Sequence, residues 1–275
     1  MTDGVAVVRP RRIAWVEGPD ACDLLHGLLT ADIRAVPVGG AARSLVLDAQ
    51  GHLVAGMAVA HDADDAFTLV LDPPPAPDGM AVISAHHVSE DAEVLGPEDT
   101  RVLVATADLA PALVGAGYLQ VPGAIPGTIE VLADDPPLVA RERGIELAAD
   151  PVLEALRIWS ATPAIGVDTS ARTLVQEARL DDAVSFDKGC YLGQETVARL
   201  HYRGHANRRL ARIALSAPVP VGTQVTADGR EVGTVTSVAE VPGHGWTALA
   251  MVRREAADHA DVDAGGTPGR VLPAP

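Results

Sequence analysis

The chain has 275 residues, 48% of them hydrophobic and 21% charged, which indicates a globular protein with one large domain or two to three smaller ones. Its formal net charge of −16 argues against a protein that coats nucleic acid or an anionic membrane. No apolar run of about 18 residues and no signal-peptide pattern is present, so we expect a cytoplasmic protein without a membrane partner.

The first part of the chain predicts strands that alternate with short helices. RRIAWVEG (residues 11–18) is typical of a strand, and Pro19-Asp20 begins a helix whose leucines recur at helical spacing. Residues 42–60 predict a hairpin around the Ala49-Gln50-Gly51 turn, and FTLVLD (residues 67–72) predicts a further strand. After a proline-rich joint, residues 100–117 predict a strand, a helix and a glycine stop, and residues 150–168 predict a helix that Pro163 ends.

From Arg208 onward the pattern changes to short strands separated by glycine turns. The Asp228-Gly229 pair is a strong hairpin signal. This region therefore predicts a small β barrel or sandwich, and the fold class as a whole is α+β followed by a separate all-β domain.

The segment DKGCYLGQE (residues 187–195) holds the only lysine among 21 Lys and Arg residues, Lys188. A chain that uses arginine for ordinary charge keeps a lysine where a compact ammonium is needed, although a single lysine must also fall somewhere. In an extended segment Lys188 and Cys190 point to the same face, and Gly193 begins the predicted helix QETVARL. The ammonium and the helix N-terminus would both favour the Cys190 thiolate, which makes Cys190 a candidate reactive or ligating thiol; the alternative is a small packing residue. The other cysteine, Cys22, lies far away without metal-ligand spacing, so we predict no metal site.

Basic residues are concentrated just after this segment. Between Arg199 and Arg212 there are five arginines, two histidines and no acid. This local reversal of charge suits a polyanionic small ligand or a phosphate, and a solvated basic loop is the alternative. RNA binding is a third interpretation, but Tyr202 is the only aromatic residue there for base stacking, so we expect no direct nucleic-acid partner.

The motif from Lys188 to Glu195 resembles at every position the signature of the YgfZ-type folate-binding proteins, which are relatives of the aminomethyltransferase (T-protein) of the glycine cleavage system. Further segments are similar to that family: VEGPDACDLLHGLLTADI, SLVLDAQGHL, RTLVQEARLDDAVSF, ARLHYRGHANRRL and REVGTVTSV. The resemblance implies three lobes around a central folate channel. The first lobe would be a discontinuous folate-binding domain of residues 1–45 plus 145–205. Residues 46–144 would form an inserted α+β domain, and residues 206–275 a C-terminal β barrel.

The resemblance also implies a set of site residues. Glu177 would meet the pterin ring of a tetrahydrofolate, and Arg199 and Arg203 would face its anionic tail. Lys188 and Cys190 would line the same cavity as the active pair. The implied folate-binding set also includes Gln194 and Tyr191.

Three departures from the family pattern qualify these expectations. Ala164 stands where an arginine is common, Arg179 stands where glycine is usual, and GVAVVRPRRIAW lacks the early acid-containing segment of the T-protein. The last departure argues against ordinary aminomethyl transfer. The predicted function is therefore a tetrahydrofolate-binding accessory factor that need not be an enzyme, for assembly or repair of iron–sulfur proteins and, through them, tRNA modification. The alternative is a folate-dependent one-carbon transferase.

Overall fold

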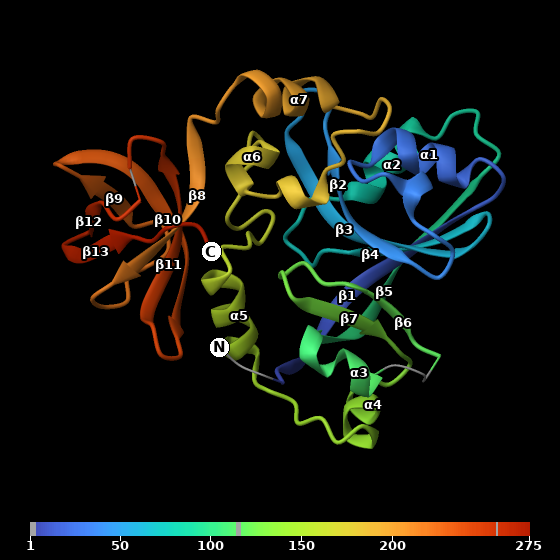
Figure 1. Ribbon diagram of the computed structural model, residues 1–275, viewed down its shortest axis with the longest axis horizontal. Coiled ribbons are helices and arrows are strands. Elements are labelled where there is room, and N and C mark those ends of the chain that lie inside the picture. The colour runs from blue at the N-terminus through green and yellow to red at the C-terminus, as the bar shows by residue number, and fades with distance from the viewer. Residues whose placement is uncertain (1–3, 114–116, 257) are drawn as a thin grey trace.

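The computed structural model describes residues 4–113, 117–256 and 258–275 and contains a large antiparallel sheet and a closed barrel (Figure 1). The sheet has seven strands in the order β2-β3-β4-β1-β5-β7-β6. Their bounds are β1 Ala6–Glu17, β2 Ala41–Leu47, β3 Leu53–Ala63, β4 Ala66–Leu71, β5 Glu93–Thr106, β6 Leu119–Pro122 and β7 Thr128–Leu132. The predicted strand at residues 11–18, the hairpin around residues 49–51 and the strand at residues 67–72 are all present.

Four helices cover the sheet: α1 Ala21–Leu28, α2 Gly79–His86, α3 Ala110–Leu113 and α4 Pro136–Glu142. Helix α1 forms as predicted after Pro19-Asp20, and its buried leucines pack with Met57 and Phe67 of the sheet. Helix α3 follows β5 as predicted, but the glycine stop expected after it includes Gly115, which lies outside the described residues.

Helices α5 (Asp150–Trp159), α6 (Val175–Ala178) and α7 (Gln194–Arg203) follow the sheet, and Figure 1 shows α5 and α6 between the sheet and the barrel. Helix α5 packs on both bodies, because Leu153 joins a cluster with Val7 and Val104 while Ile158 joins one with barrel residues. The prediction that α5 runs to Pro163 was wrong. The helix ends at Trp159, and Ala161, two residues later, has a left-handed φ of 55°, which is incompatible with an α-helix.

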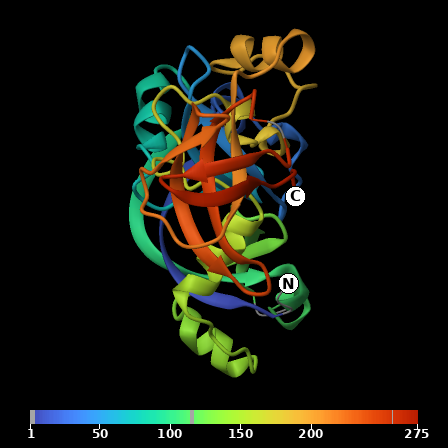
Figure 2. The same ribbon diagram turned by 90° about the vertical axis from the view of Figure 1, so that its left-hand side faces the viewer.

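The C-terminal region is a closed barrel of strand order β10-β11-β8-β13-β12-β9, which confirms the predicted barrel (Figure 2). The bounds are β8 Arg208–Leu215, β9 Gln224–Ala227, β10 Arg230–Val241, β11 Gly245–Arg253, β12 Asp261–Ala264 and β13 Thr267–Val271. The predicted Asp228-Gly229 turn joins β9 to β10. The barrel interior is filled by alanine, valine and other aliphatic side chains, as a composition with 3% aromatic residues requires.

The expected lobe boundaries cut through this sheet. The expected boundary after residue 45 falls within β2, and β1 pairs with both β4 and β5 at the centre of the sheet. Residues 1–45 and 46–144 therefore share one sheet, and the division into three lobes stays a prediction. In the described ranges, no helix combines the length and the apolar character that spanning a membrane requires.

Candidate functional site: a cavity between sheet, α6 and barrel

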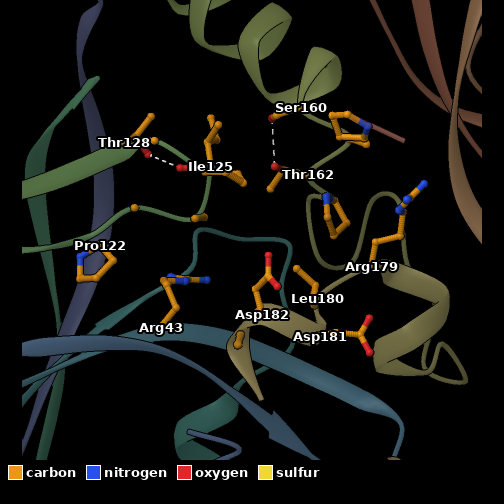
Figure 3. A pocket seen from close by; sticks show the side chains of 18 of the residues that line it. Arg43, Pro122, Ile125, Thr128, Ser160, Thr162, Arg179, Leu180, Asp181 and Asp182 are labelled. Carbon is orange, nitrogen blue, oxygen red and sulfur yellow. Dashed lines mark hydrogen bonds between the residues drawn. The ribbon is translucent and has the colours of Figure 1, made fainter. Parts of the chain in front are cut away.

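A cavity of about 870 Å³ lies where the sheet, the end of α5, the α6 region and the barrel meet (Figure 3). All three expected lobes contribute to its wall. The lining residues are Arg43, Leu45, 122–128, 160–163, Gln176, 179–183, Arg209 and Pro275. This volume falls in the range of roughly 300–1,000 Å³ that is usual for small-molecule sites.

Arg43 supplies a fixed cation on the sheet side of the cavity. It comes from β2, where it is the one charged residue of the strand. Its Nη1 and Nη2 donate to Asp72 Oδ1 and Oδ2 over 2.9 and 2.8 Å. Although burial opposes its charge, Asp72 and Glu130 raise the pKa of Arg43, so the guanidinium is charged and held in place by a bidentate pair.

Two neighbouring carboxylates, Asp181 and Asp182, also line the cavity and come just after α6. Burial raises the pKa of Asp181. In Figure 3 the Asp182 carboxylate extends into the cavity near Arg43. These groups give the cavity acceptors for N–H donors of a ligand.

A buried polar network joins α5 and the loop after it to the barrel. Arg157 Nη1 of α5 donates to Asp168 Oδ2 over 2.6 Å, and its Nη2 donates to Ser237 Oγ of β10 over 2.8 Å. Ser237 Oγ and Thr236 Oγ1 in turn donate to Asp168 Oδ1. A buried carboxylate is stable only with hydrogen-bond donors around it, and those of Asp168 come from both α5 and the barrel strand β10. Asp168 therefore holds the loop after α5 against the barrel.

Lys188 lies elsewhere, at the end of α1. Its Nζ donates to the carbonyl oxygens of His26, Leu29 and Ala31 over 2.5, 2.7 and 2.9 Å. These carbonyls belong to the C-terminal end of α1, where orphan acceptors and the negative end of the helix dipole attract a cation. Burial lowers the pKa of Lys188 to about 8, with Asp32 opposing and Arg34 reinforcing that shift. The ammonium therefore works as a clamp between the motif loop and α1.

The other motif residues surround this clamp. The Tyr191 ring centroid lies 5.0 Å from Lys188 Nζ, and burial raises the pKa of the Tyr191 phenol to about 12. Gln194 begins α7, and its Oε1 accepts a hydrogen bond from the Tyr191 backbone N–H over 3.3 Å. Cys190 is exposed and precedes α7, and within the described ranges no hydrogen bond joins its thiol to Lys188.

Glycines let the motif loop pack on the β2–β3 turn. Gly193 has a left-handed φ of 77°, and a Cβ there would collide with the Asp48 carbonyl oxygen. Gly51 faces it from the turn, and a Cβ on Gly51 would come within 2.9 Å of the Gly193 carbonyl oxygen. The motif thus requires glycine at residue 193 because two backbones meet there.

The expected folate ligands are dispersed. Glu177 is 5% exposed, and its carboxylate accepts bonds from Arg208 Nε and Nη2, both over 3.1 Å, and from the Leu174 N–H. Arg199 and Arg203 are exposed on α7.

None of the residues expected from the motif lines this cavity, and the expectation that Lys188 and Cys190 share the wall of a folate channel stays a prediction. Lys188 is instead drawn to the carbonyls of α1. The roles assigned to Glu177, Arg199, Arg203, Gln194 and Tyr191 in folate binding stay predictions. Sequence reasoning missed Arg43 and Asp182; the charge within an apolar strand was the available signal for Arg43, and Asp182 had none.

The comparisons with known proteins agree with this architecture. A family model described as "CAF17, C-terminal beta-barrel domain" matches residues 207–274. The solved aminomethyltransferase T of the glycine cleavage system from Bartonella henselae has a TM-score of 0.81 at 18% identity, covering 98% of this chain and 86% of that one. The molecule therefore has the aminomethyltransferase-like fold with a closed C-terminal barrel.

Two sequence relatives make the family more specific. The "tRNA-modifying protein YgfZ" of Edwardsiella ictaluri is 31% identical over 221 residues, which are 70% of this chain and 65% of that protein. The mouse "Iron-sulfur cluster assembly factor IBA57, mitochondrial" is 37% identical over 81 residues, 27% of this chain and 21% of the mouse protein. Together the barrel match, these relatives and the shared fold support a YgfZ-type protein, which confirms the resemblance found in the motif.

Proposed function

We propose that this protein is a tetrahydrofolate-binding accessory factor for the assembly or repair of iron–sulfur proteins, and that it affects tRNA modification through those proteins. The names of two relatives, one a tRNA-modifying protein and one an iron–sulfur cluster assembly factor, support the role. The single observation that carries folate binding is the cavity of about 870 Å³ with both carboxylates and guanidinium groups on its wall.

The lining residues fit a reduced folate chemically. A pterin ring presents N–H donors along one edge, which a carboxylate such as Asp182 can accept, and the anionic tail of the molecule suits guanidinium groups. Arg43 would help to orient the ligand, because the bidentate hydrogen bonds to Asp72 keep its guanidinium in one position. Bound tetrahydrofolate would supply a carrier for one-carbon units. The chain's own contribution is to bind and orient that carrier.

Calorimetry with tetrahydrofolate tests the proposal. We expect wild-type protein to bind, Asp182→Ala to bind at least about tenfold more weakly, and the exposed control Arg230→Ala to bind like wild type. Glu177→Ala tests the ligand expected from the motif. Folded wild-type protein that does not bind tetrahydrofolate would contradict the proposal. Turnover of an aminomethyl donor would instead favour the one-carbon transferase.

Partner proteins are the second part of the proposal. Cys190 is exposed on the motif loop and is therefore accessible to an iron–sulfur client or assembly protein. Two cysteines are too few to hold a cluster unaided, since such clusters usually take four thiolates, so any cluster contact needs ligands from the partner. We expect Cys190→Ala to abolish rescue of iron–sulfur enzyme activity in cells that lack this protein, with Cys22→Ala as the matched control.

A further inference from the structure

Arg179 occupies a backbone conformation that favours glycine. It follows α6 directly and has φ 61° and ψ 42°, in the left-handed region. A side chain there costs about 1 kcal/mol relative to glycine. A non-glycine residue held in this conformation at the wall of a cavity is a candidate for a functional side chain.

The guanidinium of Arg179 lines the cavity without a counterion. Across the described residues, neither a hydrogen bond nor an ion pair is made by its side chain. Burial and the neighbouring Arg209 lower the pKa of Arg179, whereas Asp258 and Asp181 oppose that shift. A half-buried cation beside a like charge is unfavourable unless an anion joins it.

Two further arginines, Arg209 and Arg212, lie close enough to Arg179 for their charges to interact with it. Arg209 also lines the cavity, and its Nη2 bonds to Asp258 Oδ1 over 2.7 Å and to the Ala256 carbonyl oxygen over 2.9 Å. Arg212 does not line the cavity and is 6% exposed; among the described residues its guanidinium donates to the carbonyl oxygens of Trp159 and Pro273, and its buried Nε has no partner there. In the part of the chain that the structure describes, Asp258 is the one carboxylate that forms an ion pair with any of these three guanidinium groups.

The carboxylates that line the cavity do not neutralise Arg179 directly. Asp181 and Asp182 belong to the same wall, but neither forms an ion pair with it. In Figure 3 the Arg179 side chain extends away from the Asp182 carboxylate. The wall is thus divided into an acceptor part near Arg43 and a cationic part at Arg179.

We infer that Arg179 and Arg209 form a carboxylate-binding subsite of the cavity, which takes the anionic end of its ligand. A planar guanidinium can bind a carboxylate through two parallel hydrogen bonds, and carboxylates are the anionic groups of the folate in the proposed function. The inference rests on the cavity of the proposed function: the acceptors near Arg43 would receive the pterin ring, and Arg179 and Arg209 would receive the carboxylates. The two arginines are sufficient for this subsite, so a ligand with a carboxylate but no pterin ring should bind there too.

The test compares Arg179→Gly with wild type, using p-aminobenzoylglutamate, which carries carboxylates but no pterin, and 6-methyltetrahydropterin, which carries a pterin but no carboxylate. We expect p-aminobenzoylglutamate to bind wild type and to bind Arg179→Gly at least about tenfold more weakly. The melting temperature of the glycine variant should stay unchanged or rise, because the left-handed strain is relieved.

Asp228→Gly is the matched control. Asp228 is exposed in the β9–β10 turn with φ 49°, so glycine relieves a similar conformation far from the cavity and should leave p-aminobenzoylglutamate binding unchanged. Equal binding by Arg179→Gly and wild type, a lower melting temperature of Arg179→Gly, or preference for inorganic phosphate over the carboxylate probe would overturn the subsite. Binding of the carboxylate probe without binding of the pterin would preserve the subsite while refuting the folate proposal.

Discussion

Replacing Lys188 with methionine tests the role of the motif lysine. Methionine keeps an unbranched apolar stem but leaves the carbonyl oxygens of His26, Leu29 and Ala31 without their shared donor. A hydrogen bond to a charged group contributes about 1.5–3 kcal/mol net. The desolvation that lowers the pKa of Lys188 offsets part of the total from its three hydrogen bonds. We therefore expect the free energy of unfolding to fall by about 2–4 kcal/mol, since partial solvation of the freed carbonyls moderates the loss.

Urea unfolding followed by circular dichroism measures this loss, and hydrogen exchange of the amides in residues 21–33 locates it at α1. Lys188→Arg should lose most of the same stability, because a planar guanidinium cannot direct its donors to three carbonyls that converge on one point. Arg230→Ala, which removes an exposed cation, should stay within about 0.5 kcal/mol of wild type. If Lys188→Met also stayed within that margin and exchange at α1 were unchanged, the clamp would be refuted.

Three other outcomes follow from the same structure. The single lysine can be labelled with ¹³C at Cε and observed without assignment; its NMR titration should have a midpoint near 8, below the ordinary 10.5. Between about pH 8 and pH 10.5 the lysine is protonated in the unfolded chain but has lost its proton in the folded chain. The free energy of unfolding of wild type should therefore rise with pH in this window relative to that of Lys188→Met. Parallel pH profiles of the two proteins would count against the lowered pKa. Gly193→Ala should lower stability by about 2 kcal/mol or more in thermal unfolding, because a Cβ meets the Asp48 carbonyl, and a wild-type melting temperature would show that the loop yields. Asp168→Ala should cost about 3–5 kcal/mol, because it leaves the buried Arg157 without one of its carboxylates, whereas exposed Asp64→Ala should cost almost nothing.

Local sequence signals predicted most of the elements. The leucine spacing after Pro19-Asp20 predicted α1, the Asp228-Gly229 pair predicted the β9–β10 turn, and QETVARL predicted α7. The end of α5 was missed because the left-handed conformation of Ala161 is set by the loop that Asp168 holds, not by residues next to it. That residues 1–45 and 46–144 share one sheet could not be predicted, because β1 pairs with strands far along the chain.

For the motif lysine, too, the sequence showed that the residue matters and the fold showed what it contacts. The uniqueness of Lys188 pointed to a position where an ammonium is needed, and three carbonyl contacts explain that need. Its partner, however, is the end of a helix more than one hundred residues earlier, as the separation of 162 residues between Lys188 and His26 shows. Proximity in sequence to Cys190 suggested thiolate activation, and only the fold could show that the ammonium is directed elsewhere.

By itself, the sequence determined the elements, the C-terminal barrel and the family motif, because periodicity, turn residues and a rare lysine are properties of short segments. The tertiary structure alone decided that Arg43, Asp182, Arg179 and Arg209 share one cavity while Arg199 and Arg203 face solvent. A cavity wall is assembled from distant segments, and no local pattern records which side chains the packing of sheet, helix and barrel turns toward one another.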